Sequence, residues 1–327
     1  MKGLKIANIK HPVIVFENGL GDQILTLPTL RALYTMFNDS MVLVCGDHDM
    51  SSFFFNEIKF KKIIRTTFVD ISDGVRNFNA DNVHVQIGQC DLLINLCPWQ
   101  SESGQGIQKL CYLLANVPSI GFSELFKYSI PLFYYHHISD LIFEIVKLLC
   151  DKYQIDDYVM PIKFKEKIQT KDYQYLIKKS TQNKILTVQI ETKEFKMWDL
   201  NCFNQLFDKI ICNNPNFSIV IVGSNSPKIE LYPFKNNENI SFYDTDENHM
   251  ELSCAIVAQS DYFIGIDSLF LHVADLYKIP SIGIFGPSSY TKYGCRFAKH
   301  VHVGHERRNM NFITVDAVYD AFKKLMS

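Results

Sequence analysis

The chain has 327 residues, of which 47% are hydrophobic and 21% are charged, an ordinary composition for a soluble protein of about two domains. Its 33 basic and 35 acidic side chains leave a net charge of −2, whereas a protein that coats nucleic acid needs a strong basic excess. No apolar run approaches the roughly 20 residues of a membrane-spanning helix, and the N-terminal stretch lacks the features of a signal peptide. We therefore expect a cytoplasmic chain with no nucleic-acid partner.

The nine cysteines are odd in number and scattered, with no C-x-x-C pair, so we expect reduced thiols rather than a zinc knuckle or a disulfide scaffold. Short strings such as Asp244-Thr245-Asp246, His136-His137 and Asp47-His48-Asp49 lack the further ligand that a metal site needs. We expect neither a metal ion nor a cofactor.

Short β-branched runs alternate with helical patterns along the sequence. Buried strands are predicted at 13–17, 41–45, 91–96, 184–190, 217–223, 261–266 and 280–286, with helices after the first strand, over 201–212 and near 249–259. Strands that are apolar throughout are buried on both faces, which predicts parallel sheets covered by helices.

A charged, weakly periodic stretch separates two such halves, and we place a domain boundary near residues 160–183. The closing segment 315–327 has Val315, Val318, Phe322 and Leu325 at helical spacing, so it is predicted to be an amphipathic helix. We consider packing of this helix against the first domain. Ligands of open α/β sheets bind at the carboxyl ends of the strands, where all the segments discussed next are found.

The segment E-N-G-L-G-D-Q at residues 17–23 follows the first predicted strand. Gly19 and Gly21 permit a tight turn and close approach of the backbone to a ligand. Asp22 then lies at the start of a helix, where the helix dipole favours its charge. The structural alternative is a plain Asp cap with glycines that only shape the turn.

The same segment also matches half of the dinucleotide fingerprint G-x-G-x-x-G. The third glycine is replaced by Ile24, and Pro28 interrupts the helix that should follow. Asp47, after the second strand, would serve as the acid that binds ribose. This interpretation keeps an NAD-dependent dehydrogenase open as an alternative.

In the second half, K-E-F-K-M-W at 193–198 follows a predicted strand, and its two lysines are able to hold phosphate oxygens. The alternative is a solvated loop with Trp198 as an aromatic plug. F-G-P-S-S at 285–289 closes another strand and has the form of an anion-binding nest, or of a simple turn.

The segment D-Y-F-I-G-I-D-S-L-F-L-H at 261–272 carries the strongest signal, because a buried strand runs directly into Asp267 and Ser268. The amides at the start of the following helix form a phosphate site, and His272 lies one turn further on the face of Ser268. The alternatives are Asp267 as a plain N-cap and His272 as a structural histidine.

Taken in order, these segments resemble the bacterial heptosyltransferases of glycosyltransferase family 9. The family has a G-x-G-D turn followed by T-L-P-x-L-R-x-L, a lysine two residues before a tryptophan, D-S/T-G-x-x-H, and F-G-P-T. The corresponding positions are 19–22, 26–33, Lys196 with Trp198, 267–272 and 285–288. The resemblance covers about residues 13–37 and 184–295.

The resemblance implies an α/β protein of the GT-B type, with two Rossmann-like domains whose parallel sheets face an interdomain cleft. Residues 1–165 would bind the acceptor and residues 180–314 the nucleotide sugar. It implies inverting, metal-independent transfer, with Asp22 as the general base that takes the acceptor proton. Lys196 would neutralise the diphosphate leaving group; the other residues implied in donor binding are Thr192, Asp267, Ser268, His272, Gly286 and Ser288.

Several positions depart from the family pattern. Leu269 replaces the glycine of the donor loop, Ser289-Tyr290 stand where Asp-Pro is usual, Asp199 replaces a proline, and Asp275 adds a charge to a helix that is normally apolar. These changes lie on the donor side. They leave open a donor other than ADP-heptose, or a chain that has lost activity.

The sequence thus predicts a glycosyltransferase that moves a heptose-like sugar or a hexose from a nucleotide-diphosphate donor. The acceptor would be a saccharide, a lipid-linked saccharide or a protein. Its candidate surface is the aromatic stretch 122–137 and a basic run formed by Lys59, Lys61, Lys62 and Arg65, which would also allow peripheral contact with the inner membrane. A noncatalytic nucleotide-sugar-binding protein of the same fold is the main alternative.

Overall fold

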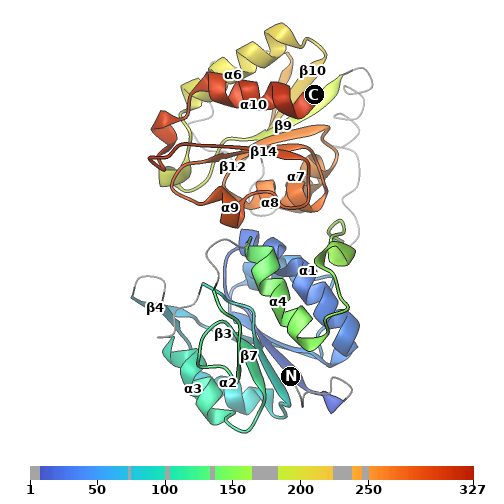
Figure 1. The fold of residues 1–327 in the computed structure, drawn as a ribbon, viewed down its shortest axis with the longest axis vertical. Coiled ribbons are helices and arrows are strands. Elements are labelled where there is room, and N and C mark those ends of the chain that lie inside the picture. The colour runs from blue at the N-terminus through green and yellow to red at the C-terminus, as the bar shows by residue number, and fades with distance from the viewer. Residues whose placement is uncertain are drawn as a thin grey trace. The chain divides into compact units, whose positions relative to one another are not determined.

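The computed structural model describes residues 8–72, 75–99, 104–132, 137–163, 183–223, 238–244 and 250–327. The chain forms two compact units, Met1–Lys163 and Phe164–Ser327, each built from one continuous stretch of chain (Figure 1).

The first unit is built on a six-stranded sheet in the order β3-β2-β1-β6-β7-β8, in which every pair is parallel. This is the doubly wound order, and it reverses between β1 and β6, the place where open α/β sheets bind ligands. The strands are β1 (Pro12–Val15), β2 (Val42–Gly46), β3 (Lys62–Thr66), β6 (Leu92–Asn95), β7 (Ser119–Gly121) and β8 (Tyr128–Ser129).

Helices cover both faces of this sheet because its central strands are apolar on both sides. Val13 and Val15 of β1 belong to a core shared with α2 (Ala80–Ile87) and α3 (Gln105–Leu113). The other face is covered by α1 (Leu20–Phe37) and α4 (Ile138–Leu149), which pack together (Figure 1). Smaller elements are the 3-10 helices η2 (Asn38–Ser40), η3 (Asp49–Phe55) and η4 (Ile155–Tyr158), and a hairpin of β4 (Val69–Ser72) and β5 (Val75–Asn77).

Helix α1 runs without a break from Leu20 to Phe37 and contains Pro28. The prediction that Pro28 interrupts this helix is wrong. A proline in a helix interior removes one backbone hydrogen bond and costs about 3 kcal/mol. Every residue of α1 from Gln23 to Leu33 is buried, and this packing offsets the cost.

The second unit repeats the same plan. Its sheet has the order β11-β10-β9-β12-β13-β14, again parallel throughout, and the order reverses between β9 and β12. The strands are β9 (Lys184–Gln189), β10 (Phe217–Gly223), β11 (Ile240–Asp244), β12 (Tyr262–Ile266), β13 (Ser281–Phe285) and β14 (His300–Gly304).

Helices α6 (Leu200–Asn213) and α10 (Val315–Met326) lie on one face of this sheet, while α7 (Met250–Ala258) and α8 (Leu269–Leu276) lie on the other (Figure 1). Three short elements follow strands: η5 (Glu194–Lys196) after β9, α9 (Tyr290–Tyr293) after β13 and η9 (Met310–Phe312) after β14.

The closing helix does not pack as considered from the sequence. Val318, Phe322 and Leu325 of α10 are buried in the core of the second unit, together with strand residues of its sheet. The helix contacts α6, β13 and β14, so its apolar face is already covered within its own unit.

The two parallel sheets with helices on both faces confirm the predicted fold class, an α/β protein with two Rossmann-like units. Within the described ranges, no helix is long and apolar enough to cross a membrane.

Candidate active site

Asp22 lies in the first turn of α1, directly after the loop that follows β1. Gly19 is the N-cap residue, and a Cβ on it would lie 3.9 Å from Oδ2 of Asp22. The half-buried carboxylate therefore bends back toward the loop, and a side chain at Gly19 would lie against it. Asp22 is the acidic residue of the first turn of α1, where a carboxylate interacts favourably with the helix dipole. Gly21, also half-buried, is part of the same turn.

The loop after β1 is fastened to the segment after β6, at the point where the strand order reverses. The indole Nε1 of Trp99 donates to the carbonyl oxygen of Glu17 at 3.1 Å, and the Glu17 amide donates to Sγ of Cys97 at 3.2 Å. The ring of Trp99 also packs edge-on against Phe16, with 6.1 Å between ring centroids. These contacts fix the loop that leads to Asp22.

Gln23, the neighbour of Asp22, holds the segment that follows β2. Its Nε2 donates to the carbonyl oxygen of Met50 at 2.8 Å, and its Oε1 accepts from the amide of Phe54 at 3.0 Å. The residue is 1% exposed, and its hydrogen bond with Phe54 is buried. Sequence reasoning missed Gln23; the available signal was an amide side chain directly before the apolar residues Ile24 and Leu25 of the helix.

Most basic side chains of the candidate acceptor surface bind other groups of the protein. Lys59 forms an exposed ion pair with Asp39, and Nζ of Lys62 donates to the carbonyl oxygen of Gln86 at 2.7 Å. Arg65 turns toward η3, where its Nη1 donates to the carbonyl oxygen of His48 at 3.1 Å. The basic run is therefore not a row of free cations.

The aromatic stretch 122–137 is mainly structural where it is described. Phe122 and Phe126 are buried, and His137 caps α4 by accepting from the amide of Ser139. Residues 133–136 lie outside the described residues.

In the second unit, the predicted donor residues gather where the strand order reverses between β9 and β12. Nζ of Lys196, at the end of η5, lies 2.5 Å from Oδ2 of Asp267, which directly follows β12. The Lys196 side chain is 25% exposed and that of Asp267 is 8% exposed, so the ion pair is shielded on the carboxylate side and open on the ammonium side. Asp267 is thus an ion-pair partner rather than the N-cap of α8, a position that Ser268 occupies.

Ser268 does not cap α8 with its own side chain. Its Oγ donates to Oε1 of Gln189, the last residue of β9. Gln189 also donates through Nε2 to the carbonyl oxygen of Glu191 at 2.9 Å. The hydrogen bond between Ser268 and Gln189 therefore links the ends of β9 and β12, in addition to the ion pair between Lys196 and Asp267. Gln189 was not predicted, although a polar residue closing an apolar strand was a usable signal.

The remaining predicted donor residues lie in different surroundings. Thr192 is half-buried in the bend between β9 and η5. His272 is 5% exposed within α8. Ser288 is half-buried after β13.

Gly286 has a packing role that the sequence did not show. A Cβ at this position would lie 2.6 Å from Cγ of Met310, and real Cβ atoms essentially never approach a neighbour so closely. The missing side chain therefore makes room for η9.

Two departures from the family pattern have structural explanations. Asp199 is the N-cap of α6 and accepts from the amide of Asn201 at 2.7 Å.

Asp275 is 3% exposed, and its carboxylate accepts from three consecutive backbone amides, those of Arg296, Phe297 and Ala298, at 2.8–2.9 Å. A buried carboxylate with three amide donors is well satisfied. Leu269, half-buried, is the first residue of α8.

No group of three His, Cys, Asp or Glu side chains gathers as a metal site within the described ranges. Thr245, Asp246 and His136 lie outside them. In the third string considered, Asp47 accepts from Oγ1 of Thr67 at 2.6 Å.

Comparison with known proteins identifies the family of this chain. The sequence model of "Glycosyltransferase family 9 (heptosyltransferase)" matches residues 110–317, nearly two thirds of the chain. Lipooligosaccharide heptosyltransferase 2 of Campylobacter jejuni is 23% identical over 282 residues, which cover 84% of this chain and 80% of that protein.

Two solved structures share the fold over nearly the whole length. A family 9 glycosyltransferase from Veillonella parvula has a TM-score of 0.67 at 16% identity, with 97% of both chains covered. The ADP-heptose LPS heptosyltransferase II of E. coli has a TM-score of 0.64 at 13% identity, with 97% of this chain and 98% of that chain covered. The match to the family leaves no support for the dehydrogenase alternative. This chain belongs to glycosyltransferase family 9, the heptosyltransferases, and is a glycosyltransferase of the GT-B type.

Proposed function

We propose that the protein transfers a heptose-like sugar from a nucleoside-diphosphate donor, ADP-heptose in the first instance, to a saccharide acceptor. The observation that carries this proposal is the Lys196–Asp267 pair at the reversal between β9 and β12. The relative from E. coli is titled as an ADP-heptose enzyme, which supports ADP-heptose as the first donor to test. The second unit would hold the donor and the first unit the acceptor.

Lys196 would neutralise the diphosphate as it leaves. Its ammonium is partly exposed and is oriented by the more buried Asp267, so it has donors left for phosphate oxygens. The amides at the start of α8, beside Ser268, would add a further positive end. Such groups stabilise developing negative charge without a metal ion, and so we propose metal-independent transfer. Thr192, His272, Gly286 and Ser288 remain proposed neighbours of the donor.

Asp22 would act as the general base. Its carboxylate would take the proton of an acceptor hydroxyl while that oxygen forms a bond to the anomeric carbon. The bond from the anomeric carbon to the diphosphate oxygen breaks, and the nucleoside diphosphate leaves with the electron pair. Because attack and departure occur on opposite faces of the sugar, the anomeric configuration inverts. Gly19 and Gly21 would keep the acceptor side of Asp22 open.

A saccharide of lipooligosaccharide is the acceptor that we propose to test first. The Campylobacter jejuni relative is named for lipooligosaccharide, which supports this choice. Peripheral contact with a membrane stays part of the proposal, although the basic run offered for it is largely bound to the protein's own groups.

Donor recognition and inversion are testable together. Wild-type protein is incubated with ADP-heptose and truncated lipooligosaccharide, with EDTA or with Mg²⁺, and ADP release and the anomeric signal of the product are recorded by NMR. We expect equal rates under both conditions and a product of inverted configuration. A rate that requires Mg²⁺, or a product of retained configuration, would refute the mechanism. Transfer from another nucleotide sugar but not from ADP-heptose would correct the donor.

A further inference from the structure

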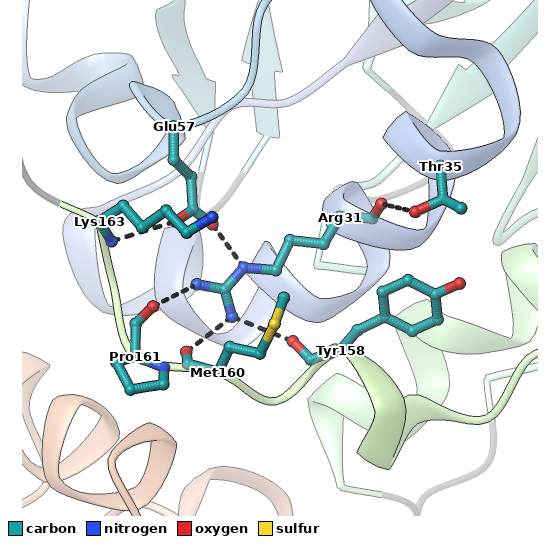
Figure 2. Close-up of polar contacts among 7 residues, drawn as sticks. All are labelled: Arg31, Thr35, Glu57, Tyr158, Met160, Pro161 and Lys163. Atoms are coloured by element: carbon teal, nitrogen blue, oxygen red, sulfur yellow. Dashed lines mark hydrogen bonds and ion pairs between the residues drawn. The ribbon is translucent and has the colours of Figure 1, made fainter.

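Arg31 belongs to the T-L-P-x-L-R segment on α1, and the proposed chemistry gives it no role. Its side chain is 5% exposed and is paired with Glu57, which is equally buried (Figure 2). Burying two charges is costly unless further hydrogen bonds satisfy both groups. The groups that form hydrogen bonds with Arg31 and Glu57 therefore indicate the structural role of the pair.

Those partners lie at the end of the first unit. Nη1 of Arg31 donates to the carbonyl oxygens of Tyr158 at 3.0 Å and Met160 at 2.8 Å, and Nη2 donates to that of Pro161 at 3.1 Å. Figure 2 shows the guanidinium surrounded by these carbonyl groups and by Glu57. Four of the five guanidinium N–H donors are thus used, three of them on one short segment.

Glu57 completes the attachment from the other side. Its Oε1 accepts from Nε of Arg31, and its Oε2 accepts from the backbone amide of Lys163 at 3.1 Å (Figure 2). Lys163 is the last residue of the first unit, and the second unit begins at the next residue. Because each unit is one continuous stretch, the covalent connection between them starts at this point.

Arg31 and Glu57, with their hydrogen bonds to residues 158–163, are called the anchor below. Arg31 of this anchor lies on the same helix as the proposed base, Asp22. Asp22 and Arg31 are nine residues apart on α1, which corresponds to two and a half turns, so they lie on opposite sides of the helix about 14 Å apart along its axis. One continuous, buried helix therefore carries both the carboxylate and the point from which the second unit is tethered.

We propose that Arg31 and Glu57 are positioning residues for transfer: they fix where the connection leaves the first unit and thereby how Asp22 is presented to the donor. This rests on the proposed function, since it requires the acceptor on the first unit and the donor on the second to meet. The role proposed for both residues requires no contact with substrate. Misplacement of reacting groups by about 1 Å lowers rates by about 100-fold, so a tether that shifts has a measurable effect.

Two variants and a matched control test the proposal. Arg31→Lys keeps the charge but loses the planar fork that reaches three carbonyl groups. Glu57→Gln keeps the volume but leaves a single acceptor oxygen, which cannot serve both Nε of Arg31 and the backbone amide of Lys163. Val83→Ala, in the core of the first unit and away from the connection, controls for lost stability.

Hydrogen exchange of residues 155–163, small-angle X-ray scattering and transfer kinetics are measured well below the melting temperature. In both variants we expect exchange to accelerate at least tenfold, the scattering distance distribution to change, and kcat to fall at least fivefold with unchanged affinity for ADP. Unchanged hydrogen exchange in residues 155–163 would show that Arg31 and Glu57 do not hold this segment. Accelerated exchange with scattering and kcat equal to those of Val83→Ala would overturn the positioning role.

The exchange and scattering experiments need no substrate. If wild-type protein shows no transfer from ADP-heptose, the proposed function fails, while these two readouts still decide whether Arg31 and Glu57 fix the connection.

Discussion

The ammonium of Lys196 lies 2.5 Å from a carboxylate oxygen of Asp267, although 71 residues separate them in sequence. The two side chains come from the loop after β9 and the end of β12, which are neighbours in the sheet. The strand order therefore creates the pair. An ammonium held in this way by a more buried carboxylate is preorganised for a second, incoming anion.

The first prediction concerns this pair. Lys196→Met should weaken ADP binding by about 10- to 100-fold, or about 1.4–2.8 kcal/mol, because the diphosphate loses a charge-assisted hydrogen bond. Isothermal titration with ADP measures the change. Lys209→Met is the matched control, because Lys209 forms an exposed ion pair with Asp316 in the same unit. Equal ADP affinity in wild type and Lys196→Met would remove Lys196 from the donor site.

The second prediction concerns Asp275. Asp275→Ala leaves three backbone amides, one buried and two half-buried, without their acceptor and should destabilise the second unit by about 3 kcal/mol. Urea denaturation monitored by hydrogen exchange of residues 294–298 measures the loss. Asp199→Asn should be nearly neutral by the same measurement, because asparagine is an equally good N-cap. A stable Asp275→Ala variant would contradict the structural explanation of this departure.

The third prediction concerns pH. Burial raises the pKa of Cys90 and of Cys111 to about 12, whereas an unfolded thiol ionises near its ordinary value of about 8.5. Below that value both states hold the proton, and between about pH 9 and pH 12 the unfolded state alone releases it. Stability should therefore fall as pH rises through this window.

The test compares urea midpoints at pH 8 and pH 10 in wild type and in the double variant Cys90→Ala, Cys111→Ala. We expect a smaller pH-dependent loss in the double variant, since the other titrating groups are shared. Identical losses in both proteins would show that these thiols do not contribute.

Much of the fold follows from local patterns. The central strands β1, β2, β9, β10, β12 and β13 are mainly apolar, and this composition predicted them because both of their faces are buried. β3 (K-I-I-R-T) and β14 (H-V-H-V-G) lie at sheet edges and mix apolar with polar side chains. They were missed because an edge strand is less buried than a central one and so does not form the apolar run by which the other strands were predicted.

The candidate site divides in the same way. Asp22, Lys196 and Asp267 follow strands, and so their positions at sheet ends were predictable. The contacts of Arg31 were not, because Glu57 lies 26 residues away and the three carbonyl groups lie at least 127 residues away. Backbone carbonyl groups also carry no side-chain signal that a sequence pattern would reveal.

The transfer rate of Asp22→Asn tests whether Asp22 is the base. The variant keeps the volume of the side chain but removes the proton acceptor, and loss of a general base costs about 100- to 10,000-fold in rate. Asp39→Asn, an exposed acid just beyond the end of α1, is the control.

Transfer from ADP-heptose to truncated lipooligosaccharide is followed by ADP release, and ADP affinity is measured on the same samples. We expect kcat to fall at least 100-fold for Asp22→Asn, with ADP affinity unchanged, and to stay the same for Asp39→Asn. A transfer rate of Asp22→Asn within about threefold of wild type would contradict this expectation, since removing a general base costs far more than that.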